Sequence, residues 1–188
     1  MADAGRVIAG TARGIRLAAP GEGTRPFGDR VKQTLFAVLE PDLAGATVLD
    51  LFAGSGAAGI EALSRGARYA TFVERDAAAA KVIAANLTRA RVADRASVVR
   101  ADVLAWVRGA GLSAGPFAVV VVDPPYGQPD LLADTLDALG PLLERDARVV
   151  AKHFWRDRPP AVVGLLASER ERRFGETALT FYRRQEDR

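Results

Sequence analysis

The sequence contains no cysteine, a single histidine and a single methionine, and aromatic residues make up only 7% of its 188 positions. Without cysteine the chain can form neither a disulfide framework nor a thiolate metal site, and we expect no bound metal. No apolar run approaches the ~20 residues that cross a bilayer, and the N-terminal segment is too polar for a secretory signal. We therefore expect a cytoplasmic protein with no membrane partner.

The remaining composition is that of a globular chain. Hydrophobic residues account for 49% of the sequence and the mean hydropathy is +0.04, which predicts one domain with a substantial core and a small appendage. We place a hairpin and connector at residues 1–28 and the main domain at residues 29–188. The formal charge of +3 and the isoelectric point near 9.7 suit an anionic partner without proving one.

The segment from Thr47 to Gly59 organises the rest of the chain. It begins as a short apolar run, typical of a strand buried on both faces, and ends in glycines that lead into a helix-forming segment at 60–65. A strand, a glycine-rich turn and a helix in this order open a nucleotide-type α/β fold. In such a fold the turn approaches a ligand closely and the helix directs free N–H groups at it.

Asp50 indicates which ligand this turn binds. Gly54, Gly56 and Gly59 match the spacing of dinucleotide folds, but an alanine-rich chain meets that spacing by chance. A carboxylate inside the preceding strand would repel a pyrophosphate, whereas it can hydrogen-bond or pair with an ammonium group. S-adenosylmethionine carries such a group, and the segment 50–56 resembles the first motif of methyltransferases that use it. The alternative is a structural turn that binds nothing.

The rest of the chain alternates strands and helices in the way that builds a parallel sheet. Strands are predicted from Thr47 and at 69–74, 96–100, 117–122 and 147–151, with an antiparallel pair at 165–174 and 177–184; helices are predicted at 76–90, after Asp102 through Trp106, and at 129–140. Upstream, a hairpin is predicted at 6–17 with its turn at 11–14, followed by a helix at 29–40 that Asp29 caps and Pro41 ends.

Acidic residues occupy or adjoin the ends of four successive predicted strands, at Asp50, Glu74, Asp102 and Asp123. Ligands of an open parallel sheet bind outside the carboxyl ends of its strands, and folding alone does not explain four acids there. Glu74 follows the glycine turn by about 20 residues, where an acid accepts hydrogen bonds from the ribose hydroxyls of either NAD or S-adenosylmethionine. Asp102 can also cap the helix that begins at Val103.

The most specific element is Asp123-Pro124-Pro125-Tyr126. Two prolines fix two φ angles and remove two N–H donors, so a rigid loop with exposed acceptors follows the buried strand. Acceptors beside an aromatic ring suit a planar base that presents an amino group. Hydrogen bonds from that amine to Asp123 and to the Pro124 carbonyl would aim the nitrogen lone pair at a sulfonium methyl, while Tyr126 fixes the plane of the base. Catalysis by this loop would consist of orientation and electrostatics.

With these motifs, the sequence resembles the amino-methyltransferases that carry an (Asn/Asp)-Pro-Pro-(Tyr/Phe) motif, and among them the RsmD family, which methylates guanine N2 in 16S ribosomal RNA. The narrowest part of the resemblance is Arg25-Pro26 with Asp29 to Phe36, and the rest lies at 6–10, 13–14, 49–56, 61–67 and 122–126. The resemblance covers nearly the whole chain. It implies a class I, Rossmann-like α/β fold with a mostly parallel seven-stranded sheet, an antiparallel C-terminal strand pair and an N-terminal β-hairpin extension.

The resemblance also implies site residues and partners. The expected catalytic residues are Asp123, Pro124, Pro125 and Tyr126. S-adenosylmethionine, which leaves as S-adenosylhomocysteine, is expected to contact Asp50, Phe52, Ala53, Gly54, Ser55, Gly56, Glu74, Arg75, Ala101, Asp102 and Val103, with Asp102 on the adenine amino group. The partner is ribosomal RNA, either free or in a partly assembled small subunit, and the protein is expected to be a monomer.

Two positions depart from the family pattern. Phe27-Gly28 stand where the family usually has threonines, and Lys152-His153 stand at the end of the fifth strand, where it often has an acid. Either change can alter the approach of substrate. His153, two residues from Trp155, is expected to pack or to contact the rim of the site rather than to catalyse.

Basic residues are expected to form an RNA-binding surface beside the Asp123 loop. They are Arg6, Arg13, Arg16, Arg25, Arg30 and Lys32. The competing interpretation for the arginines of the hairpin is that they protect an exposed edge strand from pairing with other chains.

Three other functions compete with this interpretation. A DNA adenine-N6 methyltransferase would use the same amine chemistry, but the chain is short and shows no DNA-recognition domain. A NAD-dependent oxidoreductase would explain the glycine spacing and Glu74, but no proton-relay residue is evident and Asp50 is badly placed for a pyrophosphate. A non-catalytic RNA-binding module is disfavoured because the loop 123–126 is intact.

Overall fold

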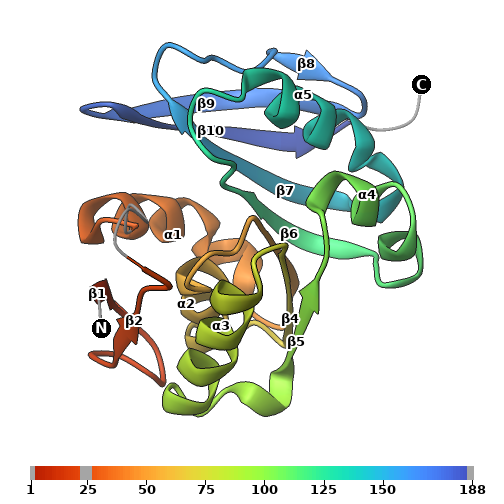
Figure 1. The fold of residues 1–188 in the computed structure, drawn as a ribbon. Helices are drawn as coiled ribbons and strands as arrows, with labels where there is room; N and C mark the ends of the chain where they lie inside the picture. The colour runs from red at the N-terminus through yellow and green to blue at the C-terminus, as the bar shows by residue number, and fades with distance from the viewer. Residues whose placement is uncertain (1–2, 22–26, 186–188) are drawn as a thin grey trace.

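The computed structural model describes residues 3–21 and 27–185, which are built around a mixed eight-stranded sheet (Figure 1). Five strands are parallel: β3 (Thr47–Leu51), β4 (Tyr69–Glu74), β5 (Ala96–Arg100), β6 (Phe117–Val122) and β7 (Leu143–Phe154). β8 (Val162–Val163), β9 (Leu166–Phe174) and β10 (Thr177–Arg184) pair antiparallel with their neighbours, and the order is β5-β4-β3-β6-β7-β10-β9-β8. The seven predicted strands and the C-terminal antiparallel pair are confirmed. The short β8 adds an eighth, unpredicted strand at the edge.

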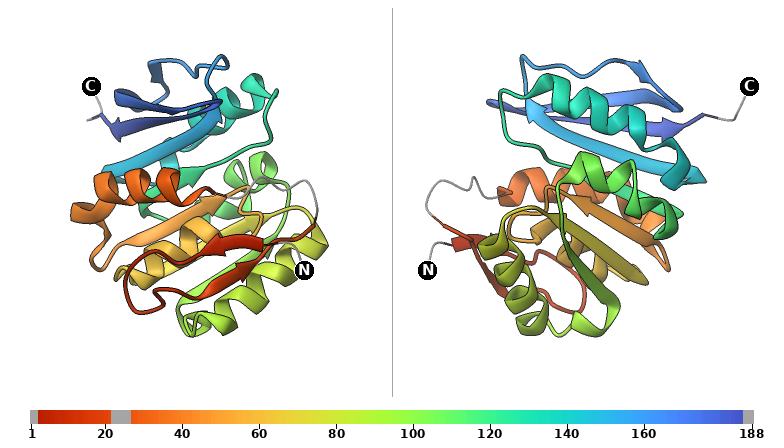
Figure 2. Two further views of the ribbon diagram at one scale, coloured as in Figure 1. Left: turned by 90° about the vertical axis from the view of Figure 1, so that its left-hand side faces the viewer. Right: turned by 45° about the vertical axis from the view of Figure 1, so that its right-hand side comes forward.

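Helices cover both faces of the sheet (Figure 2). α1 (Asp29–Leu43), α2 (Ala57–Ser64) and α3 (Ala77–Arg89) lie on one face, and α4 (Val103–Val107) and α5 (Pro129–Ala138) on the other; short 3-10 helices lie at Ala93–Arg95, Ala110–Ser113 and Gly140–Leu142. The core accordingly divides into two apolar clusters, one packed around Phe36 and Phe72 and the other around Trp106 and Leu136. Within residues 3–21 and 27–185, none of the helices combines the length and apolarity needed to cross a membrane.

The strand order creates a ligand-binding edge. From β3 the chain runs outward through β4 to β5, then returns to β6 on the other side of β3. Parallel pairing places the carboxyl ends of these strands at one edge, and the crevice between β3 and β6 is the switch point at which such sheets bind ligands. The register pairs Val122 with Ala151, so the next residues, Asp123 and Lys152, are brought side by side.

The N-terminal hairpin forms a separate two-stranded sheet from β1 (Asp3–Arg6) and β2 (Arg16–Ala18). A hairpin is confirmed here, but its strands lie outside most of the predicted 6–17 segment, and residues 7–15 form the connection. Gly10 explains how closely this connection approaches α2. Its φ is +83°, and a Cβ at this position would lie 1.8 Å from the carbonyl oxygen of Ser64.

Buried polar side chains of the main domain hold the hairpin in place. Glu61 on α2 accepts hydrogen bonds from the backbone N–H groups of Ile8 at 2.8 Å and Ala9 at 3.0 Å. Asn86 on α3 pairs with both the N–H and the carbonyl of Ala18, each at 2.9 Å. These bonds replace water around the hairpin backbone, so the extension is part of the folded unit.

α1 begins at Asp29 as predicted, but the predicted cap and the predicted C-terminal end are wrong. Gly28 occupies the N-cap position without a side-chain hydrogen bond, and Asp29 begins the helix and pairs with Arg6 at 3.3 Å instead. Pro41 lies inside the helix rather than at its end. Pro41 lacks the N–H that would bond to the carbonyl of Ala37, but Ala37 is exposed to water, so the helix continues past the proline.

Candidate active site

A cavity of about 530 Å³ opens at the carboxyl edge of the parallel strands, within the usual size range of ligand pockets. Its lining includes Phe27, Asp50, Phe52, Ala53, Gly54, Ser55, Glu74, Arg75, Asp102, Val103, Asp123, Pro124, Pro125, Tyr126 and Lys152. The structure thus brings together all four predicted catalytic residues. It also brings together the predicted cofactor residues, except that Gly56 and Ala101 do not line the cavity.

The glycine turn enters the cavity through an unusual backbone conformation. Phe52 has a φ of 58°, in the left-handed region that residues with a side chain rarely adopt and that costs about 1–3 kcal/mol. Gly54 and Gly56 follow with φ values of 56° and 76°, where glycine meets no such penalty. The sequence gives no direct signal of the strain at Phe52. The left-handed conformation at Phe52 turns the chain sharply between β3 and α2, and the Phe52 side chain lies on the cavity wall.

Glu74 holds this turn from the neighbouring strand. One of its carboxylate oxygens accepts a hydrogen bond from the N–H of Gly54 at 2.9 Å, and the other accepts from the N–H of Asp76 at the same distance. A carboxylate oxygen has two lone pairs, so these bonds leave acceptor capacity on a residue that lines the cavity. Asn86 supports the same turn by donating to the carbonyl of Ser55 at 2.9 Å.

Asp50 is a buried carboxyl group on the cavity wall, 2% exposed. It accepts a hydrogen bond from the N–H of Gly59 in the first turn of α2 at 2.9 Å. Burial raises the pKa of Asp50 to about 8, with smaller contributions from the carboxylates of Asp123 and Glu74 and against the opposing effect of the Gly59 N–H. A cationic ligand beside Asp50 would relieve this cost, so the wall favours an ammonium group.

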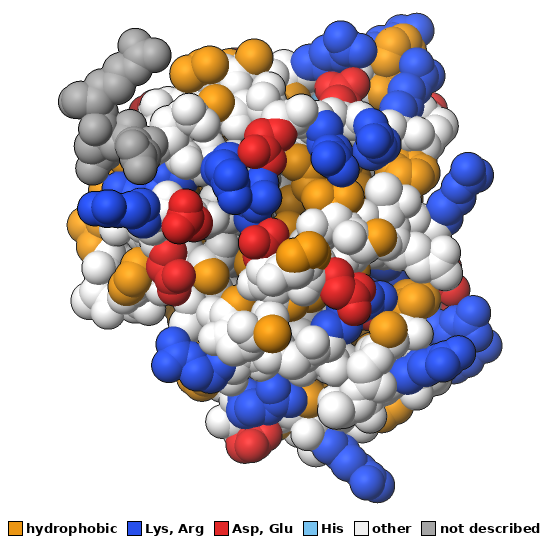
Figure 3. Space-filling view, turned by 180° about the vertical axis from the view of Figure 1, so that it is seen from behind, with side chains coloured by type: hydrophobic (Ala, Val, Ile, Leu, Met, Phe, Trp, Pro, Cys, Tyr) orange, Lys and Arg blue, Asp and Glu red, His pale blue; other side chains and the backbone are white. Residues whose placement is uncertain are grey.

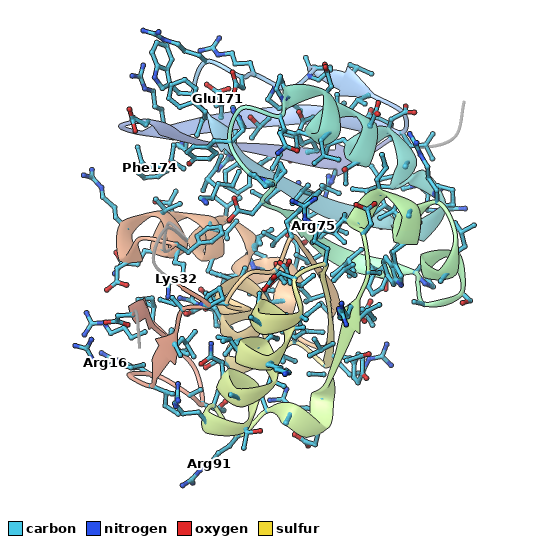
Figure 4. All side chains as sticks on the ribbon, viewed as in Figure 1. Arg16, Lys32, Arg75, Arg91, Glu171 and Phe174 are labelled. Atoms are coloured by element: carbon cyan, nitrogen blue, oxygen red, sulfur yellow. The ribbon has the colours of Figure 1, made fainter. Side chains whose placement is uncertain are left out.

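Asp102 is confirmed as a helix cap, and its contact with an adenine amino group stays a prediction. Its carboxylate accepts from the N–H of Ala105 at 3.0 Å, which caps α4, and it also lines the cavity. Arg75 follows β4 directly and lines the cavity as well (Figure 4). The wall is therefore mixed in charge at this end.

Asp123 is bound by a residue of the neighbouring strand. The ammonium of Lys152 lies 2.8 Å from both carboxylate oxygens of Asp123, and Lys152 is only 6% exposed. Burial raises the pKa of Asp123, and the charge and hydrogen bonds of Lys152 oppose the shift. The Lys152 nitrogen also lies 4.8 Å from the ring centre of Phe27 and 5.5 Å from that of Tyr126. The two departures from the family pattern therefore meet at the predicted catalytic aspartate.

The aromatic ring of the loop is fixed from β10. The hydroxyl of Tyr126 shares a hydrogen bond of 2.7 Å with the hydroxyl of Thr177, and its ring centre lies 6.1 Å from that of Phe154. His153 is buried and bonds to the Phe154 carbonyl at 2.8 Å and the Thr180 hydroxyl at 2.9 Å. Burial lowers the pKa of His153. Its expected packing role agrees with these contacts, and it does not line the cavity.

The predicted RNA-binding residues divide into several groups. Lys32 is wrong for this role, because it is fully buried between α1 and the hairpin and donates to the backbone carbonyl of Arg6 (Figure 4). The Arg6 and Arg16 side chains are exposed but pair with carboxylates at 3.3 and 2.6 Å. The remaining members are Arg13 and Arg30, which are exposed, and Arg25, which lies outside the described residues.

A second basic surface was missed by the sequence interpretation. The guanidinium carbons of Arg173 and Arg156 lie 3.7 and 4.9 Å from the ring centre of Trp155, which in turn lies 6.2 Å from the ring of Phe154. In the described part of the chain, neither arginine forms an ion pair. In the rear view, basic side chains gather at the upper right, which is the side of the turn between β9 and β10 in Figure 1 (Figure 3). The sequence signal was the three arginines among residues 170–173.

The fold is that of a class I S-adenosylmethionine-dependent methyltransferase. The model of the family described as Conserved hypothetical protein 95 matches residues 5–183. This is the RsmD family, and the chain belongs to it.

Individual relatives are similar to this chain over almost its full length. The chain is 36% identical to "Ribosomal RNA small subunit methyltransferase D" of Escherichia coli (strain K12), covering 96% of this chain and 90% of that protein. It is 38% identical to the YlbH protein of Bacillus subtilis (strain 168), covering 95% and 98% of the two chains. The solved structure of the yhhF protein of Escherichia coli superposes with a TM-score of 0.84 at 34% identity, covering 97% of this chain and 98% of that one.

Proposed function

We propose that this protein, acting as a monomer, transfers a methyl group from S-adenosylmethionine to the exocyclic N2 amine of a guanine in small-subunit ribosomal RNA. The observation that carries the proposal is the Asp123–Tyr126 loop, which lines the same cavity as the acidic ends of β3 and β4. An amine acceptor site and a site for a cationic ligand therefore open into one space.

The residues present fit S-adenosylmethionine. The carboxyl group of Asp50 suits the ammonium of the amino acid moiety, Glu74 suits the ribose hydroxyls, and Asp102 suits the adenine amino group. When bound, this group supplies an electrophilic methyl on a sulfonium sulfur and is left as neutral S-adenosylhomocysteine. The same wall disfavours a dinucleotide, because Asp50 would face a pyrophosphate.

The chain's own residues act on the amine. Asp123 and the carbonyl of Pro124 accept hydrogen bonds from the two N–H groups, which draws the nitrogen out of conjugation and orients its lone pair. Tyr126 stacks on the base and fixes its plane. As the nitrogen gains the methyl it becomes positive, and the Asp123 carboxylate stabilises that charge until one proton is released to water.

The substrate class is supported by the relatives, since the Escherichia coli protein is named for the small-subunit ribosomal RNA. A structured RNA must turn the target base out of its stack to bring it to Tyr126. We propose that residues 1–28 contact the RNA through Arg13 and Arg25, and that Arg30, at the start of α1, extends this contact. We also propose that the substrate is a partly assembled small subunit. The exposed arginines beside Trp155 provide a second contact surface.

The test is transfer of labelled methyl from S-adenosylmethionine to small-subunit ribosomal RNA, free and with its assembled proteins, followed by nucleoside analysis. N2-methylguanosine is the expected product. N6-methyladenosine would instead support an adenine methyltransferase with the same cofactor, and transfer only to duplex DNA would overturn the choice of RNA. Binding of NAD in place of S-adenosylmethionine would reject the methyltransferase.

A further inference from the structure

The pairing of Lys152 with Asp123 leaves one N–H donor of the ammonium without an acceptor among the described residues. A lysine ammonium carries three N–H groups, and Asp123 takes two of them with bonds of 2.8 Å to its two oxygens. Within the described residues, Lys152 has no third hydrogen-bond acceptor. Because Lys152 is 6% exposed and lines the cavity, little water is available to it. A buried donor of this kind stabilises whichever acceptor enters the cavity beside it.

The neighbours of Lys152 limit what that acceptor can be. The rings of Phe27 and Tyr126 lie within cation–π distance of its nitrogen, and neither ring offers a lone pair to its N–H groups. Because Lys152, Asp123 and Tyr126 line the same cavity, a base held there by the loop 123–126 lies beside the ammonium as well. The edge of that base would then face a hydrogen-bond acceptor, Asp123, beside a hydrogen-bond donor, Lys152.

We propose that Lys152 reads the target base by donating a hydrogen bond to the ring nitrogen beside the reactive amine, while Asp123 accepts from the amine. For guanine this selects the edge that carries N2 and N3. The opposite neighbour of N2 is the N1–H group, a donor that would face the ammonium. The inference rests on the proposed function, because it concerns the base that the loop 123–126 holds.

The pattern also defines what Lys152 does not distinguish. Adenine presents N6 beside N1, and cytosine presents N4 beside N3, so both offer an amine next to a ring acceptor. Lys152 therefore specifies the edge of the base, and the shape of the cavity must choose among bases. The proposed contact is therefore tested by replacing that one ring nitrogen of the target base.

The experiment compares RNA fragments that carry guanine or 3-deazaguanine at the methylated position. Two quantities are measured for each RNA: its affinity for the protein saturated with S-adenosylhomocysteine, and the rate at which it is methylated from S-adenosylmethionine. Replacing N3 by a C–H group removes the bond to Lys152, so the wild-type protein should bind the 3-deaza RNA about tenfold or more weakly. In Lys152→Met the ratio between the two RNAs should fall to about one, because both lack the bond. Lys81→Met, on the exposed face of α3, should keep the wild-type ratio.

Two results would overturn the inference: equal handling of the two RNAs by the wild-type protein, or an undiminished preference in Lys152→Met. The first needs no variant, so it decides the matter even where Lys152→Met does not fold. A wild-type protein that yields N6-methyladenosine would reject the proposed function alone. The role of Lys152 would then be tested with 1-deazaadenine at the methylated position, with the same expected ratios.

Discussion

Among single residues, Asp50 shows most clearly how burial sets chemistry in this cavity. Its carboxyl group is placed in the sheet interior by β3 and faces α2, where water is excluded and the Gly59 N–H is its hydrogen-bond donor. The raised pKa of about 8 means that the folded protein without ligand keeps a proton there near neutral pH. A bound ammonium would take the place of that proton.

The pH dependence of stability follows from the same shift. The pKa of Asp50 is raised on folding from 3.8, so its contribution to stability is complete below about pH 4 and is lost as the pH rises through about 8. Asp50→Asn cannot ionise, so its free energy of unfolding should gain on that of the wild type between about pH 5 and about pH 8. Urea denaturation of the ligand-free proteins at both pH values measures this. A constant difference, like that expected for the exposed Asp134→Asn, would contradict the assignment.

Residue identity alone predicted some of these environments and not others. The acids at the strand ends were expected in the site because parallel pairing collects carboxyl ends, and four of them line one cavity. Lys32 was expected at the surface, where lysine usually lies. Its side chain is instead buried under the hairpin, and the ammonium donates a hydrogen bond to a backbone carbonyl. Only the tertiary contact with β1 determines that outcome.

At the level of elements, α2 serves both the cavity and the N-terminal hairpin. In its first turn, the N–H of Gly59 donates to Asp50. In the next turn, the Glu61 carboxylate accepts hydrogen bonds from two backbone N–H groups of the hairpin connection and from the Arg65 side chain at 2.8 Å. The hairpin and the glycine turn are therefore fixed by one short helix.

Removing the Glu61 carboxylate should destabilise the whole fold. Glu61→Ala leaves two backbone donors without their acceptor and removes one carboxylate partner of the largely buried Arg65, which keeps Glu40. The free energy of unfolding should fall by about 2–4 kcal/mol. Urea denaturation monitored by tryptophan fluorescence measures the change. Asp134→Ala, an exposed position on α5, provides the control with an expected change within about 0.5 kcal/mol. A Glu61→Ala protein as stable as this control would refute the anchoring role.

Elements were predicted where periodicity and turn chemistry agree. The apolar strands and the alanine-rich helix α3 emerged within a residue or two, whereas β7 extends through Lys152 to Phe154, well beyond the predicted 147–151. The predicted strand stopped before Lys152, but pairing with β10 keeps residues 152–154 in the sheet. Lys152 was overlooked as the partner of Asp123 because the two residues are 29 positions apart and are brought together by the pairing of β6 with β7.

At the scale of the whole molecule, the basic surfaces lie at two ends of the chain. Arg13 and Arg30 belong to the N-terminal part, and Arg156 and Arg173 surround Trp155 near the C-terminal strands. The Trp155 surface connects to the cavity through Phe154 and Tyr126, whose ring centres lie 6.1 Å apart.

Loss of either arginine pair should weaken RNA binding and spare the cofactor site. Arg156→Ala with Arg173→Ala, and separately Arg13→Ala with Arg30→Ala, should each lower RNA affinity. The slope of log K against log salt should become shallower by about 0.7–0.9 for each phosphate that the protein no longer neutralises. Filter binding across a salt series measures the slope, and calorimetry with S-adenosylhomocysteine should show unchanged affinity. A pair whose removal leaves both RNA affinity and slope unaltered does not belong to the RNA-binding surface.

The central claim is that Asp123 orients a guanine amine in the cavity that binds the methyl donor. The most direct measurement is labelled-methyl transfer to small-subunit ribosomal RNA by the wild type, Asp123→Ala and the control Asp134→Ala, with S-adenosylhomocysteine affinity measured in parallel. We predict N2-methylguanosine from the wild type and the control, and a rate lower by about 10²–10³ in Asp123→Ala with cofactor affinity retained. Equal N2-methylguanosine production by Asp123→Ala and the wild type would contradict the account.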